Sequence, residues 1–235
     1  MQNTQTVEKP KHIQSGIVDL HHVFPTMQGE GPFAGTAAVF VRLSGCNLCC
    51  PLCDTDYTSQ RTAVKPEFIV DKVKACTTDD YATDLVVITG GEPFRQNIGP
   101  LVRVLVGLGY HVQIETNGTL YCAGFPYDDP NVTIVCSPKA GSINSKLAPH
   151  ITALKYVVHA DQIDQTDGLP ITALGHSARP VTAKPPAGFD RIIYVQPVDV
   201  EDEVENKRHL DAAVRSCFRY GYTLCLQLHK LLDLE

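Results

Sequence analysis

Short apolar runs that are rich in β-branched residues alternate along the chain with stretches of helical periodicity. The runs have the length of strands, and their nearly continuous apolarity is typical of strands buried on both faces. They are Ala37–Leu43, Leu85–Ile88, Val112–Glu115, Val132–Cys136, Leu154–Val158, Ile192–Gln196 and Thr223–Leu228. Helices are predicted over Pro66–Cys76, Ile98–Leu108 and Glu201–Tyr220, where apolar residues recur on one face. This alternation predicts an α/β fold with a parallel sheet and crossover helices.

The alternation is incomplete, because the strand-like runs outnumber the helical stretches. Residues Asp161–Asp190 are rich in glycine, proline and polar side chains and are expected to form a long excursion instead. A shortened, open (partial) β/α barrel of about six parallel strands with few helices fits better than a complete eight-fold barrel. Val18–Phe24 is expected to add a short hairpin-like strand before it. We expect Asp199 to cap the last helix and Gly221 to end it.

The bulk properties limit the classes of protein that the chain can belong to. Its 235 residues suit one domain, which we place at residues 18–235 after a flexible N-terminal extension over residues 1–17. The net charge of -6 and the lack of a basic run argue against a nucleic-acid partner. No apolar stretch approaches the roughly 20 residues of a membrane helix, and the polar N-terminus lacks a secretion signal. We therefore expect a cytoplasmic protein without a membrane partner.

Four of the nine cysteines fall in one segment, LSGCNLCCPLCDTDYTS, directly after a predicted strand. Thiolates select iron–sulfur clusters, zinc or copper(I). A structural zinc site would normally have a second pair of Cys or His ligands, and no such Cys pair exists elsewhere in the chain. We predict an iron–sulfur cluster held by Cys46, Cys50 and Cys53, with one iron left open. A zinc site and unligated thiols are the alternatives, and the spacing also allows Cys49 in place of Cys50.

The spacing Cys-x3-Cys-x2-Cys resembles the signature of radical S-adenosylmethionine (SAM) enzymes. This resemblance implies a [4Fe-4S] cluster whose open iron binds the amino and carboxylate groups of SAM. Reductive cleavage of SAM then yields a 5′-deoxyadenosyl radical, which abstracts a hydrogen from the substrate. The residue before the last Cys is usually aromatic in this superfamily, whereas here it is Leu52. The departure concerns packing near the adenine and not ligation of the cluster.

Further short motifs stand near the ends of the predicted strands. They are Met27–Gly31, Arg42, Asp54-Thr55, Thr89–Pro93, Glu115–Gly118, Ser137–Lys139, Gln196–Asp199 and Leu228–Lys230. In this order they resemble the 7-carboxy-7-deazaguanine synthase family, and the resemblance covers Val18 to the C-terminus. It implies conversion of 6-carboxy-5,6,7,8-tetrahydropterin to 7-carboxy-7-deazaguanine with loss of ammonia, SAM being regenerated and Mg²⁺ assisting. The alternative is another radical SAM enzyme, such as an activase or a different heterocycle-modifying member.

The resemblance also implies a set of residues that bind SAM. Glycines allow a ligand to approach the backbone closely, and a carboxylate such as that of Glu92 can accept from the SAM ammonium. Without the cysteine loop, the Gly-Gly-Glu-Pro segment would suit an ordinary turn at a strand end equally well. The implied SAM-binding residues are Leu52, Asp54, Gly91, Glu92, Ser137, Pro138, Lys139, Gln196, Pro197, Val198 and Asp199.

The magnesium and substrate sites are likewise implied by the resemblance. Mg²⁺ takes six oxygen ligands and few of them from protein, and Thr55 is the expected protein ligand. A charge in an apolar strand, such as Arg42, either pairs with Glu30 or binds the substrate carboxylate. The implied substrate-binding residues are Met27, Gln28, Gly29, Glu30, Arg42, Thr89, His229 and Glu235. A homodimer and an external one-electron reductant such as flavodoxin are expected by the same analogy.

Overall fold

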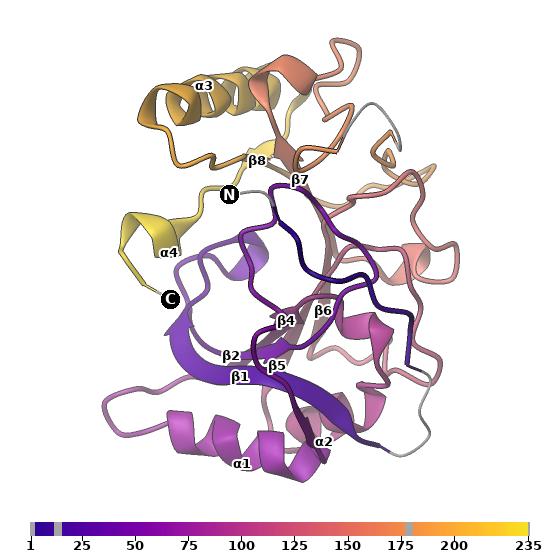
Figure 1. The fold of residues 1–235 in the computed structure, drawn as a ribbon, viewed down its shortest axis with the longest axis vertical. Helices are drawn as coiled ribbons and strands as arrows, with labels where there is room; N and C mark the ends of the chain where they lie inside the picture. The colour runs from indigo at the N-terminus through magenta and orange to yellow at the C-terminus, as the bar shows by residue number, and fades with distance from the viewer. Residues whose placement is uncertain (1–2, 12–15, 177–180, 235) are drawn as a thin grey trace.

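The computed structural model describes residues 3–11, 16–176 and 181–234. Within these residues nine strands form one sheet in the order β3-β1-β2-β4-β5-β6-β7-β8-β9 (Figure 1). The strands are β1 (Val18–Met27), β2 (Ala37–Leu43), β3 (Thr62–Val64), β4 (Leu85–Gly90), β5 (His111–Thr116), β6 (Val132–Cys136), β7 (Ala153–Val158), β8 (Ile193–Pro197) and β9 (Thr223–Leu224). All seven strand positions predicted from apolar runs are therefore occupied by strands.

The sheet is parallel from β2 to β9, whereas β1 runs antiparallel to both β2 and β3. β3 and β9 stand at opposite ends of the strand order, so the sheet is not closed. The prediction of an open, partial β/α barrel with few helices is thus confirmed. The antiparallel β1 forms the hairpin-like addition that was expected before the parallel strands.

Helices are few in the described part of the chain (Figure 1). They are α1 (Pro66–Cys76), α2 (Gly99–Gly107), α3 (Glu203–Tyr220) and α4 (Leu228–Leu231), with short 3-10 turns at Gly31–Phe33, Pro93–Arg95, Ala148–His150 and Ala160–Gln162. α1 packs against α2 and β1, and α3 packs against β7 and β8. None of the described helices is long and apolar enough to cross a membrane.

Two details at the C-terminal end differ from the sequence-based expectation. The cap of α3 is Asp202, whose side chain accepts from the amides of Val204 and Glu205, so the expected cap at Asp199 was wrong. The expected strand over Thr223–Leu228 stops at Leu224, because the chain then turns away to hydrogen-bond the β1–β2 connection and forms α4. The expected end of α3 at Gly221 is confirmed, since this glycine adopts a left-handed φ of 77°.

The core explains why the parallel strands are almost continuously apolar. In β4, Leu85, Val86, Val87 and Ile88 are all at most 2 % exposed, because alternate side chains face different apolar clusters. Val86 and Ile88 belong to the main cluster with residues of α1 and α2, whereas Leu85 and Val87 pack with Ala38 on the other face. Burying such a side chain completely contributes about 1.5–3 kcal/mol. The core therefore fixes the strand ends in space.

The division into an extension over residues 1–17 and a domain over residues 18–235 stays a prediction. Of the residues assigned to the extension, 3–11 and 16–17 are described, and residues 3–11 lie along the cysteine segment, with backbone hydrogen bonds to Cys46, Pro51 and Arg95. The excursion predicted for Asp161–Asp190 contains one 3-10 turn and otherwise irregular backbone in its described part. It lies outside the regular strand–helix succession, as the composition indicated.

Candidate active site

A cavity of about 430 Å³ lies at the carboxyl ends of the parallel strands. Successive strands of a parallel sheet end at the same edge, so side chains from distant parts of the sequence meet there. Arg42 at the end of β2 and Thr89 at the end of β4 are direct neighbours in the sheet register. Glu115 from β5 and Gln196 from β8 line the same cavity. The sheet therefore brings together four of the sequence motifs.

The cysteine segment closes one side of this cavity. Cys46, Cys50 and Cys53 all line it, and Cys46 and Cys50 are buried. Cys49 is absent from the lining, and its thiol lies 3.7 Å from the carbonyl oxygen of Asn3. The three thiols that the signature selects thus face the cavity from one loop, and the fourth points to the N-terminal segment.

Burial determines the protonation of these thiols. It raises the pKa of Cys46 to about 12 and that of Cys50 to about 11, and it also raises the pKa of Cys53. A metal bound here must therefore displace protons. Across the described residues, no group of three His, Cys, Asp or Glu side chains is arranged to hold a metal ion. Ligands of one zinc ion must meet at about 2.3 Å from it, whereas the ligands of a cubane cluster each bind a different iron. Three thiols on one loop leave one iron of a cubane cluster open, whereas a structural zinc site normally has four protein ligands.

The loop after β4 approaches the cysteine loop at Gly91. A side-chain carbon added at Gly91 would lie 2.9 Å from the backbone nitrogen of Cys46 and closer still to the carbonyl oxygen of Gly45. Glycine is therefore required sterically at this position. The amide of Glu92 donates to the same carbonyl of Gly45 at 3.1 Å. These contacts fix the separation of the two loops, and Gly91 lines the cavity.

Glu92 itself is completely buried and does not line the cavity. Its carboxylate accepts from the amide of Phe94 at 3.0 Å, the amide of Asn117 at 2.7 Å and the hydroxyl of Thr116 at 2.7 Å. Burial raises the pKa of Glu92 to about 7, although these hydrogen bonds lower it. In this structure Glu92 ties the ends of β4 and β5 together, and its role as a SAM ligand stays a prediction.

The other expected SAM-binding residues divide into two groups. Pro138 and Pro197 do not line the cavity, whereas eight residues do: Leu52, Asp54, Gly91, Ser137, Lys139, Gln196, Val198 and Asp199. Lys139 hydrogen-bonds the carbonyl oxygen and the hydroxyl of Ser137. Burial lowers the pKa of Lys139, and the neighbouring Lys155 lowers it further. An anionic group beside these lysines would relieve this electrostatic strain.

Two carboxylates at the cavity edge share one cation from α4. The ammonium of Lys230 lies 3.0 Å from Asp54 and 2.8 Å from Asp199. The hydrogen bond from Lys230 is the main cause that lowers the pKa of Asp199 to about 2. Burial would raise the pKa of Asp54, but the charge of Lys230 lowers it. This pair of contacts holds α4 over the region next to the cysteine loop.

Six of the residues expected to bind substrate line the same cavity: Met27, Gln28, Glu30, Arg42, Thr89 and His229. Thr55, the expected magnesium ligand, lines it as well. Gly29 lies beneath α4, where an added side-chain carbon would stand 2.9 Å from the backbone nitrogen of His229. Glu235 lies outside the described residues. His229 therefore reaches the cavity from a short helix and not from a strand.

Glu30 is buried and forms an ion pair with Lys155. The amide of Gln196 also donates to Glu30 at 3.1 Å. Burial would raise the pKa of Glu30, but the charge of Lys155 outweighs this and lowers it. Arg42 lies over the ring of Phe24, with its guanidinium carbon 4.9 Å from the ring centre. Lys155 is thus an ion-pair partner of Glu30 that the sequence analysis did not consider.

Lys155 and Glu115 are among the cavity residues that were missed from sequence. Lys155 interrupts the apolar run of β7, which is the same signal that singled out Arg42. Glu115 belongs to a recognised motif but received no role. Its carboxylate accepts from Gln28 at 3.0 Å and from Thr89 at 3.3 Å, so it connects two of the expected substrate-binding residues.

Comparison with known proteins agrees with this geometry. The family model of the radical SAM superfamily matches residues 40–122. The chain is 43% identical over 226 residues to a 7-carboxy-7-deazaguanine synthase of Rhodospirillum rubrum, covering 92% of each chain. It is 37% identical to that of Rickettsia prowazekii, covering 93% of this chain and 89% of the relative. A crystal structure of QueE from Escherichia coli matches with a TM-score of 0.66 and 25% identity, covering 90% of this chain and 94% of the other.

The open β/α barrel with three cysteines at its strand ends is that of a radical SAM enzyme. Such an enzyme uses a [4Fe-4S] cluster and SAM. Within this superfamily the chain belongs to the 7-carboxy-7-deazaguanine synthase family. Mg²⁺ is the additional metal that this family uses.

Proposed function

We propose that the chain converts 6-carboxy-5,6,7,8-tetrahydropterin to 7-carboxy-7-deazaguanine with loss of ammonia, using SAM as a reusable cofactor. The observation that carries this proposal is that the cysteine loop and the paired polar side chains at the ends of β1, β4 and β5 line one cavity. Relatives that are similar over nine-tenths of the chain are named for formation of this product. The reaction is a ring contraction, so the enzyme has to hold one small heterocycle in a fixed orientation beside the cluster.

Cys46, Cys50 and Cys53 are the proposed cluster ligands. When bound, the cluster and SAM supply a 5′-deoxyadenosyl radical that removes a hydrogen atom from the substrate. The protein contributes the enclosed position of the thiols, since burial keeps bulk solvent from the cluster site and limits side reactions. The position of Cys49 outside the cavity lining supports Cys50 as the second ligand.

SAM is proposed to lie between the cysteine loop and the ends of β4, β6 and β8. Gly91 would allow its amino acid portion to approach the backbone, and the ammonium of Lys139, which lines the cavity, suits its carboxylate. Asp54 and Asp199 would accept from ribose hydroxyls. Leu52 would pack on the adenine. Glu92 stays the proposed acceptor for the SAM ammonium. Pro138 and Pro197 would act through the conformation of their loops, and the backbone at Val198 would complete this side.

The substrate is proposed to lie between β1, β2 and β5. A pterin edge presents neighbouring hydrogen-bond donors and acceptors, which Glu115 and Gln28 can pair as a unit because they already contact each other. Arg42 is the proposed bidentate partner of the substrate carboxylate. Thr55 is the proposed magnesium ligand. His229, held against Gly29, would close the cavity from α4.

We further propose a cytoplasmic location, a homodimer and a flavodoxin-like electron donor. A reducing compartment suits the nine free cysteines. It also suits a cluster that must accept an electron at low potential. The dimer and the donor rest on the family alone.

The decisive experiment is anaerobic incubation of the cluster-loaded protein with SAM, dithionite, Mg²⁺ and carboxytetrahydropterin. The expected result is the absorption of a deazaguanine, with no net consumption of SAM. Formation of 5′-deoxyadenosine without deazaguanine would contradict the proposed substrate and favour another radical SAM reaction. Purified protein that contains zinc and lacks iron and the brown absorption band would contradict the radical mechanism as a whole. Chelation of Mg²⁺ before the assay tests the magnesium proposal separately.

A further inference from the structure

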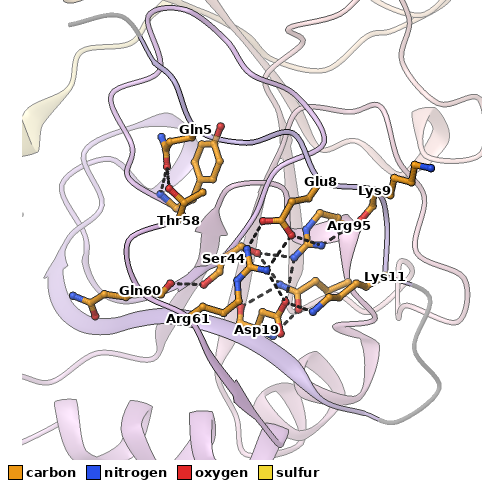
Figure 2. A network of polar contacts seen from close by, with 12 residues as sticks. Gln5, Glu8, Lys9, Lys11, Asp19, Ser44, Thr58, Gln60, Arg61 and Arg95 are labelled. Atoms are coloured by element: carbon orange, nitrogen blue, oxygen red, sulfur yellow. Dashed lines mark hydrogen bonds and ion pairs between the residues drawn. The ribbon is translucent and has the colours of Figure 1, made fainter.

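Residues 3–11, called here the N-terminal strap, run along the outside of the segment from Cys46 to Arg61, called here the cluster loop. Figure 2 shows the strap residues Gln5, Glu8 and Lys11 beside residues of this loop and of the strand ends. Val7 pairs with Cys46 as an isolated parallel bridge. The strap therefore pairs through its backbone with the first residue of the cluster loop.

The strap donates hydrogen bonds to the backbone of the cysteine segment. The amide of Glu8 donates to the carbonyl of Cys46 at 2.7 Å. The side-chain amide of Asn3 donates to the carbonyl of Cys50 at 3.0 Å, and its backbone amide donates to Pro51 at 2.9 Å. Two of the three proposed ligands are thus held through their own peptide groups.

Gln5 fixes the part of the loop that follows the third ligand. Its side-chain amide donates to the carbonyl of Thr55 at 2.8 Å. Its side-chain oxygen accepts from the amide of Tyr57 at 2.8 Å and from the hydroxyl of Thr58 at 3.0 Å. The half-buried side chain of Gln5 therefore satisfies three hydrogen-bonding groups within residues 55–58. The side-chain amide thus donates and accepts as a backbone peptide group of a neighbouring strand would.

The other end of the strap is fastened by charges. Glu8 pairs with Arg61 and lies 3.2 Å from the buried guanidinium of Arg95, which also reaches Asp19 at 3.4 Å (Figure 2). Arg95 further donates to the carbonyl of Ser44 at 2.9 Å, two residues before the cluster loop. Charge-assisted hydrogen bonds are about twice as strong as neutral ones. The strap, the loop and the strand ends thus share one network.

We propose that the N-terminal strap positions the cluster loop, with Asn3, Gln5 and Glu8 as positioning residues that hold the cysteine ligands in place and keep water from the loop's outer face. The alternative is that the strap only packs against the core. The strap buries little apolar surface, however, since Thr4, Thr6 and Val7 are exposed. The contacts concentrate on the carbonyls of the ligand segment, so their effect is local to it. This inference rests on the cluster assignment and is independent of the proposed substrate.

The test uses the full chain with Gln5→Ala, with Thr6→Ala as a matched control from the same strap. The first readout is the rate at which the loaded protein loses its brown absorption to a chelator under anaerobic conditions. Losing a hydrogen-bonding group that serves three partners should accelerate this loss by about five-fold or more. Thr6→Ala should behave as the wild type does, because its side chain is exposed.

The second readout is the midpoint potential of the cluster. Water reaching the loop stabilises the more negatively charged reduced cluster, so Gln5→Ala should shift the potential to more positive values. Urea unfolding of the metal-free protein accompanies both measurements, and its midpoint should stay close to that of the wild type. Deletion of residues 3–11 should give larger changes in the same direction as Gln5→Ala.

Wild-type rates and potentials in both Gln5→Ala and the deletion variant would overturn the proposal. Equal changes in Gln5→Ala and Thr6→Ala, or a parallel fall in the unfolding midpoint, would replace it with general packing. Should the deletion variant not fold, Gln5→Ala alone decides. Absence of deazaguanine together with changed cluster readouts would contradict only the proposed function.

Discussion

Replacing Lys155 by methionine tests the buried ion pair beneath the cavity. Glu30 and Lys155 are 8% and 7% exposed, and with Lys155 removed the carboxylate of Glu30 keeps the hydrogen bond from Gln196 as its remaining side-chain donor. Methionine has a similar volume, so no large cavity is created. Removing one partner of a buried pair costs about 3–5 kcal/mol, because the other charge is left uncompensated. A loss of that size is a large part of the 5–15 kcal/mol that stabilises a typical domain.

The pH dependence of this loss has a definite sign. In the wild type Lys155 lowers the pKa of Glu30, so its stabilisation is present above the unfolded-state pKa and disappears as the pH falls through the folded-state value. Without Lys155, burial raises the pKa of Glu30 above its unfolded value. Protonation then stabilises the folded variant as the pH falls. The difference between wild type and variant should therefore shrink from about pH 8 to about pH 5.

The assay is urea unfolding of the metal-free, reduced protein at several pH values, followed by circular dichroism. Lys74→Met is the matched control, because Lys74 is exposed on α1 and its loss should change the free energy of unfolding by no more than about 0.5 kcal/mol. The double variant Glu30→Gln/Lys155→Met removes both charges and should recover much of the loss. A cost below about 1 kcal/mol at pH 8, or one independent of pH, would refute the reasoning.

Three further outcomes are expected at the cavity. Cys50→Ala should abolish iron binding, whereas Cys49→Ala should retain the brown cluster. Iron analysis after anaerobic loading distinguishes the two variants, and the reverse result would make Cys49 the ligand. Gly29→Ala should displace His229, because the new carbon would stand 2.9 Å from the backbone nitrogen of His229. Calorimetry should then show weaker substrate binding. An unchanged affinity would argue against closure of the cavity by α4. Lys230→Met should raise the KM for SAM several-fold. It should change the free energy of unfolding by less than about 1 kcal/mol, because the ion pairs of Lys230 with Asp54 and Asp199 are partly exposed. An effect on kcat alone would contradict this expectation.

The fold was largely predictable because it follows from periodicities that local physics imposes. The apolar runs of β2 and β6 matched their observed bounds, and so did the helix α1. Such runs have to be buried on both faces, and strand–helix alternation leaves a parallel sheet as the simple solution. Errors occurred where burial did not decide the structure. β9 is an exposed two-residue edge strand, and the segment after it leaves the sheet to cover the β1–β2 connection.

The candidate site was predictable in part, because some of its residues carry short-range signals. The cysteine spacing pointed to the loop, and the motifs at strand ends pointed to one edge of the sheet. The pairing of Glu30 with Lys155 joins residues 125 positions apart in the chain, and no local pattern contains such a contact. The same holds for Gln5, whose position beside Thr55 follows from the path of the strap over the loop.

The sequence by itself determined the class of fold, the cysteine loop and the set of motifs that meet at the strand ends, because these depend on spacing and on the polarity of neighbouring residues. The tertiary structure alone decided that Cys49 turns to the N-terminal segment, that Glu92 turns inward to tie β4 to β5, and that residues 3–11 lie on the cluster loop. These features depend on which groups remain unsatisfied after the core has packed. That outcome is settled only when segments far apart in the chain come into contact.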